Sequence, residues 1–168
     1  MNILGVSAFY HDAAAALIKD GEIVAAAQEE RFTREKHDPR FPLHALKYCC
    51  EAGGVGPSSI DYVVFYEKPL RKFDRIVRSF IQTSPGYSHQ FMQAMSEWLP
   101  VKIRQRRLIE KSMSAAIGGK WASRILFSGH HLSHAASAFY PSPFQSAAVV
   151  TVDGVGEWDT TTIGVGSG

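Results

Sequence analysis

The chain opens with three short apolar runs that have the length of β-strands. They cover residues 2–7, 13–19 and 22–28, and Asp20-Gly21 separates the second run from the third. An Asp-Gly pair between two such runs is a strong signal for a tight β-hairpin, because both residues tolerate positive φ angles. We therefore expect an antiparallel meander, which restricts the chain to architectures that contain a sheet.

Helical patterns follow the meander. Helical spacing starts after Pro42 and ends at the glycine pair 53–54, since Pro is favoured at the first helical position and Gly just past the last. A helical insertion is expected over about 68–122, with helices near 71–82 and from Tyr87 onward. The second of these helices carries an apolar stripe formed by Phe91, Met95, Trp98 and Leu99. A further helix is expected at His130 to Tyr140.

Further apolar runs predict strands at 61–66, 125–127 and 160–165. Residues 147–152 form a continuous run rich in β-branched residues, which is typical of a strand covered on both faces. Hairpin strands together with strands separated by helices predict a mixed sheet and an α/β fold. No segment follows the run at 160–165 to pair with its edge, so we expect the sequence to be a fragment of a longer protein.

Composition limits the classes of function. The 168 residues are 45% hydrophobic, which is enough to bury a core, and a net charge of +2 provides no long-range field for nucleic acid or acidic lipid. Cys49 and Cys50 are adjacent, which excludes a disulfide framework and favours a reducing compartment. No apolar run approaches the roughly 20 residues of a membrane span. We expect a cytoplasmic protein with no nucleic-acid or membrane partner, and homo-oligomer formation stays open.

The strongest chemical signal is a histidine cluster on the expected helix. His130 and His134 are one turn apart on one helix face, near enough for both imidazoles to bind one metal ion. His131 points about 100° away, which suits a contact to a ligand or to the substrate. Asp153 follows the run 147–152, and two imidazoles with a carboxylate suit iron, zinc or manganese. The alternative is that the histidines cap the helix or lie in solvent.

A stretch rich in Gly and Thr follows Asp153. The backbone amides at Gly154 and Gly156 are available to anionic oxygens, as in a phosphate-contacting loop. The stretch lacks the spacing of a P-loop or a dinucleotide fingerprint. A hairpin connection between two strands has the same composition, so both interpretations remain open.

Four motifs follow one another along the chain. They are NILGVS with HDAA at 2–7 and 11–14, AAAQEERFTREKHD at 25–38, GHHLSHA at 129–135 and VDGVGE at 152–157. In this order they resemble the N-terminal part of the NodU/TobZ-type carbamoyltransferases, which carbamoylate hydroxyls of nodulation factors, aminoglycosides and other natural products. The resemblance implies that residues 1–168 are the first lobe of an actin-like ATPase (ASKHA, ribonuclease-H-like) domain. The second lobe and a C-terminal YrdC-like domain would be absent from this chain.

The resemblance also implies a reaction and its cofactors. Carbamoyl phosphate and ATP would give carbamoyl adenylate in the YrdC-like domain, and the carbamoyl group would pass to a hydroxyl of a small-molecule acceptor. A divalent metal, expected to be Fe(II), would be held by His130, His134 and Asp153. A further Asp ligand of the family lies beyond Gly168, so we expect the chain to be inactive without the rest of the protein.

Further site residues are carried over by position. The resemblance places His11 near the carbamoyl group as acid or base, with Asp12 to orient it, and gives Lys36 contacts to carbamoyl or phosphate oxygens. The remaining candidates are Arg31, His37 and His131 for the substrate, and Gly154 and Gly156 for the cofactor. Solvated salt bridges are the alternative for the charged residues of this loop.

Two other classes of function share these residues. A metal-dependent ATPase or hydrolase would use the same ligands with water as the acceptor. A non-catalytic remnant would act as a binding module and would have no need of the metal. Metal binding separates the remnant from the two enzymes, and the products separate the enzymes from each other.

Overall fold

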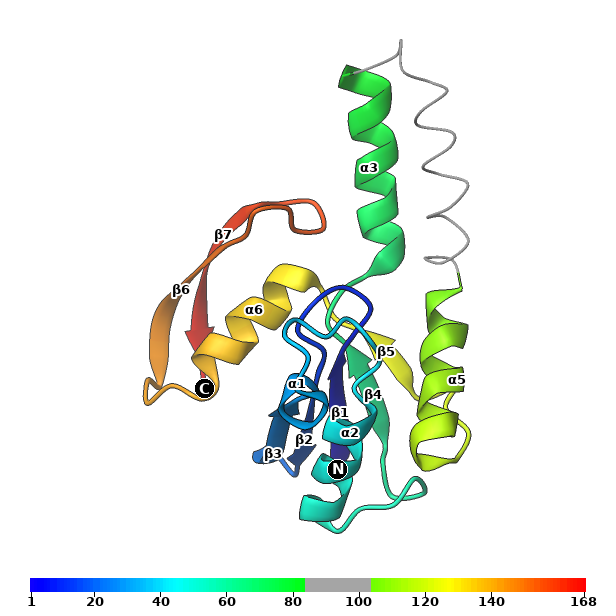
Figure 1. Ribbon diagram of the computed structural model, residues 1–168. Helices are drawn as coiled ribbons and strands as arrows, with labels where there is room; N and C mark the ends of the chain where they lie inside the picture. Colours follow the sequence, from blue (N-terminus) through cyan, green and yellow to red (C-terminus); the bar gives the residue numbers. More distant parts are fainter. Residues whose placement is uncertain (84–103) are drawn as a thin grey trace. The chain divides into compact units, whose positions relative to one another are not determined.

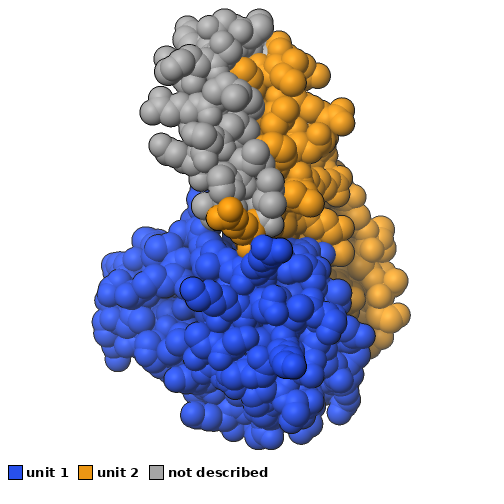
Figure 2. Space-filling model, turned by 90° about the vertical axis from the view of Figure 1, so that its right-hand side faces the viewer, with its two compact units in different colours: residues 1–66, 106–127 blue, residues 67–105, 128–168 orange. Residues whose placement is uncertain are grey.

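The computed structural model describes residues 1–83 and 104–168, which divide into two compact units (Figure 2). Unit 1 comprises Met1–Tyr66 and Arg106–Phe127, and unit 2 comprises Glu67–Gln105 and Ser128–Gly168. The helix expected from Tyr87 onward, with its apolar stripe, lies outside the described residues. Each unit has its own sheet.

Unit 1 is built on a five-stranded mixed sheet with the strand order β3-β2-β1-β4-β5 (Figure 1). Strand β2 is antiparallel to β1 and β3, whereas β4 is parallel to β1 and β5 is parallel to β4. The α/β class and the mixed sheet are therefore confirmed. The elements are β1 (Asn2–Ser7), β2 (Ala14–Lys19), β3 (Glu22–Gln28), α1 (Glu30–Thr33), α2 (Leu43–Gly53), β4 (Tyr62–Phe65), α5 (Gln105–Ile117, in unit 1 from Arg106) and β5 (Ile125–Phe127).

The turn between β2 and β3 confirms the predicted hairpin. Asp20 and Gly21 have φ angles of 52° and 92°, both in the left-handed region that a tight primed turn requires. Lys19 pairs with Glu22 across this turn, and Ala14 pairs with Gln28 at the far end of the ladder. The local Asp-Gly signal was therefore sufficient to place the first sheet connection.

One face of the sheet forms the core of unit 1. Leu4 pairs with Leu17 on β2 and with Val63 on β4, and all three side chains are fully buried. Because side chains alternate along a strand, every second residue reaches this face. Burial of each large side chain contributes about 1.5–3 kcal/mol relative to an exposed one. The helices and the segment after α5 supply the opposing layer, with Leu46, Cys49, Ile109, Met113 and Trp121.

A buried carboxylate caps the N-terminus of α2. Pro42 precedes the helix and makes no side-chain cap, but Glu29 accepts backbone hydrogen bonds from His44 and Ala45 at 2.9–3.1 Å. The His44 ring adds a bond from Nδ1 at 2.6 Å, and Glu29 is 2% exposed. These donors are the unpaired N–H groups of the first turn, where negative charge is favourable. Glu29 thus fixes an 11-residue helix that would be marginal in isolation.

Within its described residues, unit 2 contains two helices and a two-stranded sheet. Strands β6 and β7 are antiparallel, and α6 packs on them. The elements are α3 (Pro69–Thr83), α6 (His130–Phe139), β6 (Ser146–Val152) and β7 (Thr161–Ser167). None of the helices within the described ranges has the length and apolar character needed to cross a bilayer.

Two predictions about these last strands are wrong. The run at 147–152 is not covered on both faces: Val152 on β6 is 77% exposed, and α6 covers the opposite face. The run at 160–165 does not lack a partner, because residues 153–160 turn the chain back and β7 pairs with β6 from Val152–Thr161 to Ser146–Ser167. Apolar content predicts a strand but does not reveal which other elements cover it.

The Glu29 cap can be tested by Glu29→Gln. We expect the substitution to lower the free energy of unfolding by about 1–3 kcal/mol. In glutamine, an NH₂ donor replaces one of the two carboxylate oxygens and would face the backbone N–H groups of the helix. Urea denaturation followed by circular dichroism measures the change. The control is Glu51→Gln at an exposed position on the same helix, which should stay within about 0.5 kcal/mol of wild type. Equal stability of the two variants would contradict the cap.

Candidate metal centre

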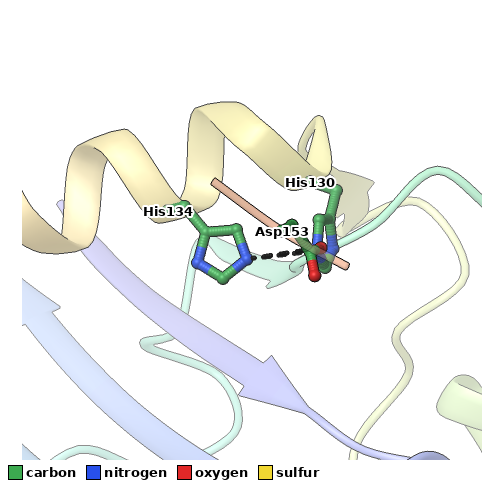
Figure 3. Close-up of side chains that lie close together, drawn as sticks. All are labelled: His130, His134 and Asp153. Carbon is green, nitrogen blue, oxygen red and sulfur yellow. Dashed lines mark hydrogen bonds and ion pairs between the residues drawn. The ribbon is translucent and has the colours of Figure 1, made fainter. Parts of the chain in front are cut away.

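Helix α6 and the end of β6 bring His130, His134 and Asp153 together (Figure 3). The helix begins at His130 after the extended residue Gly129, so the two imidazoles project from one face, one turn apart. Asp153 directly follows β6. The sequence spacing predicted the histidine pair, and the packing of α6 on β6 adds the carboxylate.

The three donor atoms converge. His130 Nε2 lies 2.5 Å from Asp153 Oδ2 and 3.1 Å from His134 Nε2, and the third distance, His134 Nε2 to Asp153 Oδ2, is 3.8 Å. Ligand atoms bound to one ion at about 2.0–2.2 Å stand roughly 3–3.5 Å apart. Two imidazole nitrogens and a carboxylate oxygen form a donor set that suits Fe(II) and Zn²⁺. Only the 3.1 Å distance lies in this range, so the residues fit a divalent ion by their donor types and close approach, with small adjustments of the side chains, and the metal itself stays a prediction.

The electrostatics favour the forms that bind metal. Burial would raise the pKa of the Asp153 carboxyl, but hydrogen bonds from His130 and from the amides of Val155 and Gly156 outweigh it and lower the pKa. Burial, followed by the charge of neighbouring His130, lowers the pKa of the His134 imidazole. Metals bind the ionised carboxylate and the neutral imidazole. The His134 side chain is 51% exposed, so the site opens to solvent on that side.

His131 lies between the strands and the loop that follows β6. Its Nε2 is 2.6 Å from the carbonyl oxygen of Asp159 and its Nδ1 is 2.6 Å from Thr151 Oγ1. In the neutral ring, Nε2 donates and Nδ1 accepts, because a carbonyl can only accept. Thr151 in turn lies 2.6 Å from Thr162 Oγ1 on β7. Both ring nitrogens thus have partners within unit 2, and a substrate contact by His131 stays a prediction.

Thr151 is not among the candidate site residues that the sequence motifs indicate. A signal was present, because Thr151 is the one polar residue in the apolar run 147–152. It is buried, and its hydroxyl joins α6 to both strands through His131 and Thr162. Buried hydroxyls require partners, so a lone polar residue in an apolar run indicates a hydrogen-bonded position.

The two glycines after Asp153 differ in what surrounds them. Gly156 has a φ of 56°, and a Cβ there would collide with the Asp159 carbonyl oxygen and approach His131 Nε2. Its N–H donates to Asp153 Oδ2 at 3.2 Å. Open space surrounds the Cα of Gly154. The turn itself therefore requires glycine at 156, and cofactor contacts at Gly154 and Gly156 stay predictions.

In unit 1, Asp12 joins two histidines. Asp12 Oδ2 lies 2.7 Å from His11 Nδ1, and Oδ1 lies 2.9 Å from His37 Nδ1. The hydrogen bond from His37, then that from His11, lowers the pKa of the Asp12 carboxyl. The expected contact between Asp12 and His11 is present. The contact from His37 is new, since the sequence analysis placed His37 with the substrate.

The charged loop at 29–42 is anchored from within. Asp38 is buried and accepts hydrogen bonds from Arg40 at 2.6–3.0 Å and from Thr33 at 2.9 Å, and its backbone carbonyl accepts from Ala13. Arg31 and Lys36 are exposed on this loop. They belong to unit 1, as do His11, Asp12 and His37, whereas the candidate metal ligands belong to unit 2.

Comparison with known proteins places the chain among longer relatives. A family model described as carbamoyltransferase N-terminus matches residues 2–168. The uncharacterized protein sll1178 of Synechocystis is 50% identical over 170 residues, which cover 99% of this chain and 28% of that protein. Nodulation protein NolNO of Sinorhizobium fredii is 36% identical over 160 residues, which cover 95% of this chain and 22% of that protein. The chain spans about a quarter of the length of these curated relatives.

The anchor at Asp38 predicts a pH-dependent stability. The Arg40 guanidinium beside Asp38 outweighs the effect of burial and holds the pKa of that carboxyl well below its usual range. Such a group stabilises the fold above its unfolded-state pKa of about 3.9 and loses this contribution as pH falls toward the folded-state pKa. Asp38→Asn should therefore destabilise the protein most near neutral pH, and the difference from wild type should shrink below about pH 4.

Urea denaturation at about pH 7 and about pH 3 measures this difference. Asp74→Asn is the control, because Asp74 forms an exposed ion pair with Arg78 on α3. Pairs of that kind contribute about 0–1 kcal/mol. A stability loss for Asp38→Asn that is equal at both pH values would show that Asp38 acts by packing and not by its charge.

Proposed function

The chain belongs to the carbamoyltransferase N-terminus family, and from this premise we propose that it forms part of an enzyme that transfers a carbamoyl group to a hydroxyl of a small-molecule acceptor. The observation that carries the proposal is the convergence of His130, His134 and Asp153. The similarity to nodulation protein NolNO over 95% of the chain supports the same class of enzyme.

We propose that these three residues hold a divalent ion and that this ion is Fe(II). When bound, the ion supplies a Lewis acid that polarises the carbamoyl carbonyl. The chain contributes rigidity: α6 fixes the spacing of His130 and His134, and the amides of Val155 and Gly156 orient the Asp153 carboxylate. Ligands held in this way need little rearrangement on binding.

His11 is the proposed proton-transferring group. Asp12 accepts a hydrogen bond from Nδ1 of His11, which leaves Nε2 as the basic nitrogen of the neutral ring. Nε2 would take the proton of the acceptor hydroxyl while the hydroxyl oxygen attacks the carbamoyl carbon. Lys36 and Arg31, exposed on the charged loop, would bind the anionic oxygens of the donor.

The proposed donor is carbamoyl adenylate, made from carbamoyl phosphate and ATP in another part of the protein. In the transfer step the acceptor oxygen forms a bond to the carbamoyl carbon, and the bond from that carbon to the phosphate oxygen of AMP breaks. The proposed fold is the first lobe of an actin-like ATPase domain. The strand order β3-β2-β1-β4-β5, in which β2 alone runs antiparallel, supports a ribonuclease-H-like sheet.

Metal analysis tests the centre directly. The purified protein, loaded anaerobically with Fe(II) and desalted, should retain close to one equivalent of metal, and His130→Ala or His134→Ala should remove it. Leu132→Ala, at an exposed position on the same helix, should retain the metal. Bound metal should stabilise the folded form by about 2.7 kcal/mol at roughly 100 times its Kd. Absence of both binding and stabilisation would refute the metal centre and favour a non-catalytic remnant.

Product analysis separates transfer from hydrolysis. The full-length protein would be supplied with carbamoyl phosphate, ATP and a panel of hydroxylated acceptors, and mass spectrometry would detect carbamoylated product. We expect an acceptor-dependent product that is lost in His11→Ala. Consumption of ATP and carbamoyl phosphate with every acceptor, without any carbamoylated compound, would identify a hydrolase and defeat the transferase assignment.

A further inference from the structure

Helix α3 is hydrogen-bonded to the loop at residues 153–160, which carries Asp153. The Arg75 guanidinium on α3 donates through Nη1 to the backbone carbonyls of Val155 and Gly156, the latter at 2.9 Å. The Arg78 guanidinium lies 5.8 Å from the ring centroid of Trp158. Positions 75 and 78 are three residues apart and share one helix face, so this face of α3 contacts Val155, Gly156 and Trp158 of the loop.

A buried carboxylate of the loop adds a second connection between the loop and α3. Glu157 is 4% exposed and accepts a hydrogen bond from the backbone N–H of Lys68, the residue before the start of α3. A carboxylate is favourable at this end of a helix, where N–H groups lack partners within the helix. A side chain of α3 therefore binds backbone carbonyls of the loop, and a side chain of the loop binds a backbone N–H at the start of α3.

Hydrogen bonds within the loop connect the segment held by α3 to Asp153. The loop is closed at its base by a hydrogen bond from the Asp153 N–H to the Thr160 carbonyl at 2.8 Å. Its far side is held by His131, which donates to Asp159. The amide of Gly156, whose carbonyl Arg75 binds, donates to Asp153 Oδ2. A single peptide segment thus links the Arg75 guanidinium to the carboxylate oxygen beside His130.

We propose that Arg75 and Glu157 are positioning residues for the metal centre. They hold residues 153–160 so that Asp153 Oδ2 stays beside His130 Nε2, and α3 thereby controls metal affinity without contributing a ligand. Arg75 is suited to this role because one of its guanidinium nitrogens, Nη1, donates to two adjacent carbonyls of the loop. The inference rests on the proposed metal centre. Mutation of residues that orient metal ligands through hydrogen bonds typically weakens metal binding 10–100-fold.

The test measures metal affinity and loop order separately. Co(II) serves as the probe for affinity and ligand geometry, through titration and its visible absorption spectrum. Arg75→Ala should raise the Co(II) Kd about 10–100-fold and change the spectrum, and Arg75→Lys should lie between Arg75→Ala and wild type. Glu157→Gln should weaken binding in the same direction. Arg71→Ala is the matched control at an exposed position on α3 and should bind like wild type.

Hydrogen exchange of the metal-free protein reports the loop without the metal. Arg75→Ala should increase exchange across residues 153–160 while the strands of unit 1 keep their protection. A wild-type Kd for both Arg75→Ala and Glu157→Gln, with His130→Ala still abolishing binding, would overturn the inference and leave the metal centre intact. Unchanged exchange in Arg75→Ala would overturn the inference whether or not wild type binds Co(II). Failure of wild type to bind Co(II), together with increased exchange in Arg75→Ala, would refute the metal centre and with it the role of Arg75 in metal affinity.

Discussion

A carboxylate that is removed from water must have its oxygens occupied by donors, and the irregular segments of this protein depend on that constraint. Glu29 occupies the N-terminal amides of α2, Asp38 binds the Arg40 side chain inside the charged loop, and Glu157 binds the backbone at the start of α3. Each group joins segments that the regular hydrogen bonds of helices and sheets do not reach. These contacts fix the loops that carry the candidate site residues, in addition to the packing of Phe9 and Phe41 against the core.

The candidate metal centre follows the same logic at shorter range. Two of its ligands are set by helical geometry alone, because His130 and His134 occupy successive turns of α6. The third, Asp153, lies in a turn and owes its orientation to backbone amides and to the residues that hold that turn. Arg75 belongs to a helix some 80 residues earlier in the sequence, yet it binds this turn directly. The precision of the site is therefore a property of unit 2 as a whole.

Comparison of the expected and observed elements shows where local patterns suffice. The hairpin at Asp20-Gly21, the helix ending before Gly54 and the helix starting at His130 all follow from residues within a few positions of each element. The burial of β6 was predicted wrongly, because an apolar run has the same pattern whether one face or two are covered. The role of Glu29 was missed for a related reason: a motif rich in charge does not reveal that one of its members is buried against a helix N-terminus.

The sequence by itself determined the mixed α/β class, the order of most elements and the histidine pair, because these depend on backbone periodicity and on side-chain chemistry. Tertiary structure alone decided that β7 pairs with β6, that His37 shares Asp12 with His11, and that Arg75 binds the loop after Asp153. The physical reason is that a hydrogen-bond partner is chosen by proximity after the chain has packed. Sequence separation carries no information about which distant donor will reach a given acceptor.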